Sequence, residues 1–255
     1  DQAMVYEHAG DVLKSLGYSC EPVAETTEES PHFVSMVPFD DLLWRCPKRL
    51  DVIGSTNAQM LPRERWYLYA TIFALAPERC LEIGVSQGGS TRIIHAALSD
   101  LNQGRLIALD PQLQLTYDPD SLADYVTFLE ASSPEGLQKA SELAGGLFDF
   151  VLLDGDHSTP GAKNDLLGLS EFTTKGAIVL AHDAYYPPVA EGLRQALAEG
   201  APFADAGVVS TTPHRGRQGK DIVTYAGFRM FVRNGLKRKS GAWQKLTRFL
   251  KRISS

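Results

Sequence analysis

Short apolar runs alternate with amphipathic segments along the middle of the chain. Five runs rich in leucine or β-branched residues each end at a glycine or a polar residue: 79–85, 105–110, 126–130, 148–154 and 177–181. Four segments between or after them have the apolar spacing of a helix face: 90–101, 134–143, 160–171 and 188–199. Buried parallel strands and covering helices have these patterns. The alternation predicts an α/β, Rossmann-like, doubly wound sheet with helices on both faces.

Both ends of this region depart from the alternation. A further helix is predicted over residues 63–75, with an apolar face made of Trp66, Tyr69, Ala70 and Phe73. Beyond residue 199, two strands are predicted at 207–210 and 227–233, joined by a long polar loop. We therefore expect a mostly parallel sheet that ends in a C-terminal antiparallel hairpin.

The pattern divides the chain into one main domain and two additions. We expect residues 1–62 to form an N-terminal cap or lid and residues 63–233 to form the main domain. Residues 234–255 predict a basic amphipathic helix. Such a helix suits peripheral contact with an anionic membrane surface. Packing on the body of the protein or on a second subunit of a homo-oligomer is the commoner role of an apolar helix face.

Composition and charge narrow the function classes. The 255 residues are 44% hydrophobic and 22% charged, which is typical of a globular protein. No apolar run reaches the length of about 20 residues that a membrane span needs, and the first residues lack a secretory signal pattern, so we expect a cytoplasmic protein. Residues 1–232 hold 17 basic and 31 acidic residues, a net charge of −14. A nucleic-acid partner is not expected, because phosphate binding needs a basic face.

A glycine-rich turn follows the first predicted strand, in the sequence CLEIGVSQGGST of residues 80–91. Glycines let the backbone pass close to a ligand, and the following helix start offers free N–H groups. Asp110 ends the next predicted strand, where a carboxylate can accept hydrogen bonds from ribose hydroxyls. The two features together indicate a nucleoside cofactor.

The residues of the turn discriminate between nucleoside cofactors. The dinucleotide fingerprint needs a glycine two residues after Gly84, and Ser86 stands there. Glu82, just before the turn, would repel a pyrophosphate but suits the amino group of a methionine moiety. These two residues favour S-adenosylmethionine over NAD.

Four motifs in order, CLEIGVSQGGST, LIALD, FDFVLLDGDHS and GAIVLAHDAY, resemble class I S-adenosylmethionine-dependent methyltransferases. The resemblance covers about residues 62–200 and is strongest to the subgroup with an LEIG…GGST…DGDHS…HD pattern, which includes enzymes of sugar, macrolide and O-antigen modification. It implies that residues 130–133, with Ser132, border the adenine and that Asp110 binds the ribose. It further implies that the methionine end is lined by Glu82, Gly84, Ser86, Gly88, Gly89 and Ser90.

Polar residues follow the fourth and fifth predicted strands, and the carboxyl ends of these strands meet at one edge of the sheet. The residues are Asp154, Asp156, His157, His182 and Asp183. We expect Asp154, His182 and Asp183 to hold Mg²⁺ or another divalent cation, which would orient an acceptor hydroxyl and lower its pKa. Metal-dependent relatives have an Asp-Asn or similar pair where this chain has His182-Asp183. An alternative stays open, in which Asp154 and Asp183 cap helices or hydrogen-bond the cofactor without an ion.

Methyl transfer from a sulfonium needs alignment and removal of the acceptor proton. A histidine is the expected general base, with His157 as the first choice and His182 as the second. A purely structural role remains open for each. Asp165, eleven residues after Asp154 on the next predicted helix, is expected to orient the DGDHS loop, although a plain position on the helix face remains open.

The sequence thus predicts a methyltransferase that acts on a small-molecule hydroxyl, and the resemblance implies that the acceptor is a sugar or glycosylated metabolite. The N-terminal cap and residues 210–226 would close over the acceptor. One alternative is a cofactor-binding regulatory protein without activity, which the cluster of polar residues disfavours. Another is an NAD-dependent oxidoreductase, which Ser86 and the lack of a Tyr-x-x-x-Lys relay disfavour.

Overall fold

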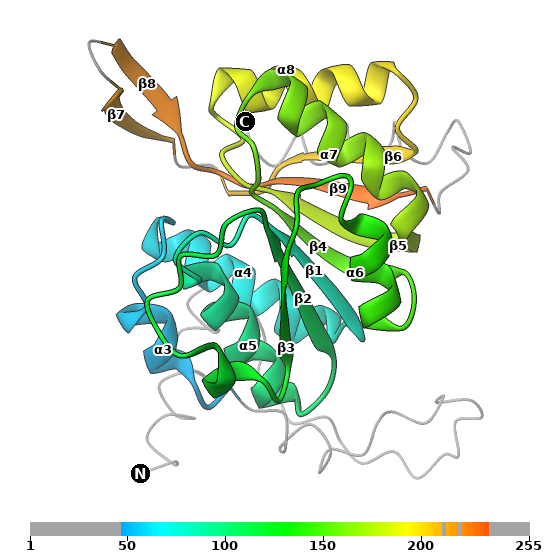
Figure 1. The fold of residues 1–255 in the computed structure, drawn as a ribbon. Coiled ribbons are helices and arrows are strands. Elements are labelled where there is room, and N and C mark those ends of the chain that lie inside the picture. The colour runs from blue at the N-terminus through cyan, green and yellow to red at the C-terminus, as the bar shows by residue number, and fades with distance from the viewer. Residues whose placement is uncertain (1–46, 211–212, 219–220, 235–255) are drawn as a thin grey trace, which may run out of the picture. The chain divides into compact units, whose positions relative to one another are not determined.

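The computed structural model describes residues 47–210, 213–218 and 221–234 (Figure 1). Most of the predicted N-terminal cap and nearly all of the basic C-terminal helix lie outside these residues. None of the helices in the described part of the chain has the length and apolar character that a membrane span requires.

One large sheet forms the centre of the molecule, with the strand order β3-β2-β1-β4-β5-β9-β6. Neighbouring strands from β3 to β5 are parallel, whereas β9 is antiparallel to both β5 and β6. This confirms the predicted Rossmann-like, mostly parallel sheet with an antiparallel C-terminal pair. The strands are β1 Arg79–Ile83, β2 Arg105–Asp110, β3 Val126–Glu130, β4 Phe148–Leu153, β5 Thr173–Ala181, β6 Phe203–Val208 and β9 Arg229–Arg233.

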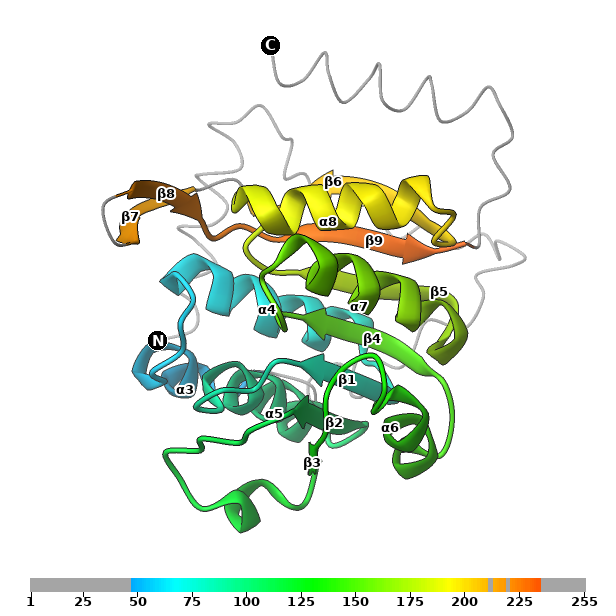
Figure 2. The same cartoon turned by 45° about the horizontal axis from the view of Figure 1, so that its top comes forward.

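Helices cover both faces of the sheet, and alternate strand residues supply the two cores (Figure 2). Cys80, Leu106 and Phe150 belong to one core with the apolar residues of α3, α4 and α5. Leu81, Ile107 and Val151, their sequence neighbours, belong to the other core with α6, α7 and α8. The helices are α3 Leu50–Ser55, α4 Pro62–Leu75, α5 Gly89–Leu101, α6 Leu137–Ala144, α7 Thr159–Phe172 and α8 Pro187–Ala198, and a 3₁₀ turn, η1, spans Pro119–Leu122.

The segment between β6 and β9 differs from the prediction of a polar loop. It forms a two-stranded antiparallel sheet, β7 His214–Gln218 and β8 Asp221–Tyr225. This arm extends beyond the large sheet (Figures 1 and 2). The prediction failed because the arm lacks a buried face: Ile222, its clearest strand-forming residue, is 72% exposed.

The apolar face predicted for α4 is also wrong in part. Trp66 is 45% exposed and Ala70 is exposed, while the helix buries Glu64, Leu68, Tyr69 and Ile72. A hydrophobicity pattern places every glutamate on the solvent side. Glu64 instead lies inside, because its carboxylate has hydrogen-bond partners there.

The parallel strands end in register at one edge of the sheet. Ile83 of β1 pairs with Leu109 of β2 and with Leu153 of β4, and Leu153 pairs with Ala181 of β5. The residue that follows each of these strand positions therefore lies at the same edge. These residues are Gly84, Asp110, Asp154 and His182.

Candidate active site

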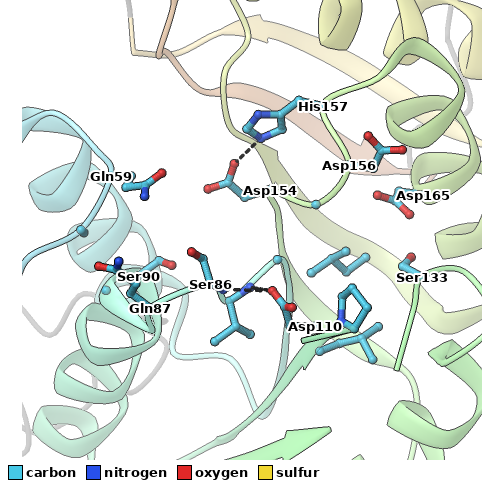
Figure 3. A pocket seen from close by; sticks show the side chains of 18 of the residues that line it. Gln59, Ser86, Gln87, Ser90, Asp110, Ser133, Asp154, Asp156, His157 and Asp165 are labelled. Carbon is cyan, nitrogen blue, oxygen red and sulfur yellow. Dashed lines mark hydrogen bonds and ion pairs between the residues drawn. The ribbon is translucent and has the colours of Figure 1, made fainter. Parts of the chain in front are cut away.

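A cavity of about 520 Å³ opens at this carboxyl edge, within the size range of small-molecule sites (Figure 3). Gln59 and Ser90 lie on one side of it, and Ser133 and Asp165 lie on the opposite side. Asn57, Ala58 and Met60 join Gln59 on the wall, so the described part of the predicted cap borders the cavity. The predicted cofactor residues on its wall are Gly84, Ser86, Gly89, Ser90, Asp110, Ser132 and Asp154.

The glycines of the turn are required by their protein neighbours. Gly84 has φ of +90°, and a Cβ built there would lie 2.0 Å from the carbonyl oxygen of Asp154. Gly88 has φ of +78°, and its Cβ would lie 2.2 Å from the hydroxyl oxygen of Tyr117. Only glycine fits both positions. Gly88, unlike Gly84, is not among the residues of the cavity wall.

Asp110 fastens the glycine turn from the end of β2. Its Oδ2 accepts hydrogen bonds from the backbone N–H groups of Val85 at 2.8 Å and Ser86 at 2.9 Å. Its Oδ1 accepts one from the N–H of Gln112 at 2.8 Å. Oδ1 can accept one further bond, so Asp110 can bind a ligand while it holds the turn.

Glu82 lies beneath the turn and does not line the cavity. Its side chain is fully buried and accepts hydrogen bonds from the Ser90 hydroxyl and, at 2.6 Å, from the Thr91 hydroxyl. Burial raises the pKa of the Glu82 carboxyl to about 7. In this structure Glu82 supports the start of α5 from within the core.

Asp165 lines the cavity, a position that the sequence analysis did not assign to it. Its side chain comes from α7 and is only 2% exposed. Burial raises the pKa of its carboxyl to about 6, with a further contribution from the negative charge of Asp156. The available signal was its position on the helix that follows the DGDHS motif.

The residues that follow β4 and β5 form one charged cluster. Asp154 Oδ1 lies 3.1 Å from His157 Nε2 and 3.2 Å from His182 Nδ1. Asp183 Oδ2 lies 3.5 Å from His157 Nδ1. Each of the two carboxylates therefore lies close to both imidazoles of this predicted reaction site.

The two imidazoles of the cluster differ in exposure. The His157 side chain is 43% exposed at the cavity wall, whereas that of His182 is 4% exposed. The hydrogen bond with Asp154 raises the pKa of His157. Burial opposes the charged form of His182, but the negative charges of Asp154, Glu64 and Asp183 outweigh it and hold the pKa well above its usual value. Burial likewise opposes ionisation of Asp154, yet the two imidazoles lower its pKa to about 2.

Glu64 is a member of this cluster that the sequence analysis missed. Its fully buried carboxylate accepts a hydrogen bond from the Leu61 N–H at 2.8 Å and another from the Gly227 N–H. Its Oε2 also lies 3.3 Å from His182 Nε2. The weak available signal was a glutamate in the first turn of a helix that starts with proline.

Three of these residues form a donor set that fits a divalent cation. Asp154, His182 and Asp183 each place one ligand atom within 4.8 Å of the other two. Around one octahedral cation with bonds of about 2.1 Å, ligand atoms lie about 3 to 4 Å apart, so small movements bring the set together. Carboxylate oxygens and imidazole nitrogens are common ligands of such ions.

The fold and this site define a class of protein. An open α/β sheet, a glycine turn at a helix start, an acid after the second strand and a cavity at the carboxyl edge are the parts of a nucleoside-cofactor site. Residues 81–184 match a family model described as a methyltransferase domain. The match runs from β1 to just beyond β5 and includes Asp110, Asp154 and His182.

Solved methyltransferase structures share the fold. An O-methyltransferase from Bacillus cereus, in complex with SAH, has a TM-score of 0.50 at 17% identity, over 77% of this chain and 90% of that chain. A SAM-dependent O-methyltransferase from Thermotoga maritima has a TM-score of 0.51 at 14% identity, over 76% of this chain and 74% of that chain. No curated protein matches the sequence. Residues 81–184 therefore match a methyltransferase domain, and the chain has the Rossmann-like fold of these solved structures.

Proposed function

We propose that the protein transfers the methyl group of S-adenosylmethionine to a hydroxyl oxygen of a sugar or glycosylated metabolite. The observation that carries the proposal is the continuity of the cavity from the glycine turn to the charged cluster. The donor binds along the turn, and its methyl group faces Asp154 and His157. The acceptor class rests on the resemblance of the motif series to sugar- and macrolide-modifying O-methyltransferases.

Different residues of the cavity wall bind different parts of S-adenosylmethionine. Ser86 and the free backbone N–H groups at the start of α5, where Ser90 lies, receive the methionine carboxylate, because a helix start favours negative charge. Asp110 accepts a hydrogen bond from a ribose hydroxyl through its Oδ1. Ser132 and Asp165 border the adenine, whose exocyclic amino group can donate to a carboxylate.

The chemistry is an in-line displacement. The acceptor oxygen forms a bond to the methyl carbon while the carbon–sulfur bond breaks, and the sulfur keeps the electron pair. His157 takes the acceptor proton, because it is the partly exposed imidazole of the cluster. His182 is the weaker candidate for general base, since its side chain is buried and does not line the cavity.

Asp154, His182 and Asp183 would hold the cation, Mg²⁺ or another divalent ion. When bound, the ion supplies positive charge that lowers the pKa of the acceptor hydroxyl. Asp154 also anchors both imidazoles through one oxygen, so it keeps His157 beside the cavity. Residues 57–60 and the arm of β7 and β8 would bound the acceptor side, in keeping with the predicted closing segments.

A methyl-transfer assay tests this function. The purified protein is incubated with S-adenosylmethionine and a panel of nucleotide sugars, glycosylated macrolides and catechols, each with Mg²⁺ or with a chelator. We expect S-adenosylhomocysteine to form with a sugar-bearing acceptor and the rate to fall with the chelator. Turnover of catechols alone would contradict the acceptor class, and full activity in the chelator would contradict the role of the cation.

A further inference from the structure

We infer that Glu64 is a positioning residue of the reaction site, which fixes His182 so that its Nδ1 faces Asp154 and Asp183. This inference deepens the proposed function and rests on it for the role of the cation. Glu64 belongs to α4 and precedes His182 by 118 residues. It lies before residues 81–184, the part of the chain that matches the methyltransferase domain.

Glu64 determines which ring nitrogen of His182 carries hydrogen. Both oxygens of the Glu64 carboxylate accept hydrogen bonds from backbone N–H groups, one from Gly227 and one from Leu61, so the carboxylate faces its neighbours as an acceptor. Nε2 of His182, 3.3 Å from Glu64 Oε2, must therefore be a donor. Nδ1 is left as the nitrogen that faces Asp154 Oδ1, at 3.2 Å.

The imidazole has little freedom to turn away. His182 packs against the ring of Phe228, with 5.2 Å between the ring centroids, and its side chain is 4% exposed. A carboxylate bound to one nitrogen of a buried histidine sets the orientation of the ring and the basicity of the other nitrogen. Glu64 contacts Nε2 of His182 in this way, and it therefore orients Nδ1 toward Asp154 and Asp183.

Glu64 is also linked to Asp183, because both side chains accept hydrogen bonds from the backbone that leads from β8 to β9. Its Oε1 accepts a hydrogen bond from the Gly227 N–H, and Asp183 Oδ1 accepts one from the neighbouring Ala226 N–H at 2.6 Å. Ala226 and Gly227 in turn accept hydrogen bonds from the N–H groups of Tyr185 and Ala184, both at 3.1 Å. One buried carboxylate thus locates two of the three residues of the donor set.

The substitution Glu64→Gln tests this arrangement with little change of shape. Donors contact both oxygens of Glu64, namely the Gly227 N–H at Oε1 and the Leu61 N–H and His182 at Oε2. A glutamine amide turns its NH₂ toward one of these donors in either orientation. We expect the affinity for Mn²⁺, measured by calorimetry, to fall about 10- to 100-fold. The affinity for S-adenosylhomocysteine should change less than about twofold, since Glu64 is not on the cavity wall.

A matched variant separates positioning from general stability. Asp100→Asn alters another buried carboxylate, which accepts hydrogen bonds from the Lys48 and Arg49 N–H groups and, at 2.6 Å, from the Tyr69 hydroxyl. This position lies near the end of α5, away from the cavity wall. Asp100→Asn should lower the free energy of unfolding and leave the affinity for Mn²⁺ unchanged.

The protonation of His182 gives a readout that needs neither activity nor metal. Long-range ¹H–¹⁵N spectra of the wild-type protein should show Nε2 of His182 protonated, both with and without Mg²⁺. In Glu64→Gln the Nε2 signal should move toward that of a nitrogen without hydrogen. A wild-type spectrum in which Nε2 lacks hydrogen would overturn the inference, even if Glu64→Gln does not fold.

The remaining outcomes separate this inference from the proposed function. A folded Glu64→Gln protein with unchanged Mn²⁺ affinity, or an equal loss in Asp100→Asn, overturns the positioning role. A wild-type protein that binds no S-adenosylhomocysteine overturns the proposed function instead. A wild-type protein that binds S-adenosylhomocysteine but no Mn²⁺ overturns the positioning of a cation ligand.

Discussion

The two halves of the sheet's carboxyl edge are built by different means. The half that follows β1, β2 and β3 consists of glycines, backbone N–H groups and one carboxylate, Asp110, that ties them together. The half that follows β4 and β5 consists of charged side chains in contact, and it depends on Glu64 from a distant helix. The first half is a shaped surface for a ligand, whereas the second is a set of coupled charges.

Substitutions in the two halves should therefore have different effects. A buried charge is costly unless its partners are present, so a change in the coupled half disturbs every member of the cluster. A change in the glycine turn acts first on the backbone shape and on binding of the methyl donor. Binding of the donor and methyl transfer should therefore respond to different residues.

Loss of the partly exposed imidazole should have the largest effect. His157→Gln removes the proposed general base, and we expect kcat for methyl transfer to fall about 10²- to 10⁴-fold. The dissociation constant of S-adenosylhomocysteine should stay within about twofold, which calorimetry would show. His95→Gln is the matched control, because His95 pairs with Asp124 at 2.9 Å outside the cavity. Equal loss of kcat in both variants would remove His157 from the mechanism.

Breaking the glycine turn should have the next largest effect. Gly84→Ala adds a Cβ 2.0 Å from a carbonyl oxygen at φ of +90°, and we expect the free energy of unfolding to fall by about 3 kcal/mol or more. Gly145→Ala has a similar φ of +72° with open space around it, and should cost only about 1 kcal/mol. Denaturant unfolding measures both values. Equal costs would show that the close approach to Asp154 is not tight.

Loss of the Asp110 carboxylate should weaken binding of the methyl donor and leave binding of the cation unchanged. In Asp110→Ala the turn loses its two carboxylate hydrogen bonds and the ribose its partner, so the affinity for S-adenosylhomocysteine should fall about 10- to 100-fold. The Mn²⁺ affinity should not change. Asp149→Ala removes a carboxylate that likewise accepts two backbone N–H bonds, from Glu78 at 2.9 Å and Arg79 at 3.0 Å, at the start of β1. A similar loss of donor affinity there would mean that Asp110 acts only through stability.

The buried acid on the cavity wall should produce a dependence of stability on pH. The pKa of Asp165 is about 6 in the folded protein and about 3.8 when unperturbed. The folded state therefore binds the proton more tightly, which adds to the free energy of unfolding at a pH below about 3.8. This added stability is lost as the pH rises to about 6. Relative to wild type, Asp165→Asn should gain about 2 to 3 kcal/mol of unfolding free energy between pH 4 and pH 7.

Urea unfolding at a series of pH values measures this gain. Glu171→Gln, on the exposed side of the same helix, should leave the pH dependence unchanged. A constant difference between Asp165→Asn and wild type at all pH values would show that Asp165 ionises normally in the folded protein.

The same contrast explains what the sequence could predict. Strand and helix positions followed from local hydrophobic patterns, and the glycine turn and Asp110 lie in short motifs whose geometry is set by neighbouring residues. The arm of β7 and β8 escaped prediction because it buries little apolar surface. Glu64 escaped because its burial depends on partners far along the chain, Gly227 and His182, which no local pattern contains.

Titration of the wild-type protein with S-adenosylhomocysteine and, separately, with NAD tests the central claim most directly. Calorimetry would be done with Mg²⁺ and with a chelator. The account predicts saturable binding of S-adenosylhomocysteine at about one site per chain, and no binding of NAD, because Ser86 occupies the place of the glycine that a pyrophosphate needs. Binding of NAD, or of neither compound, would contradict it.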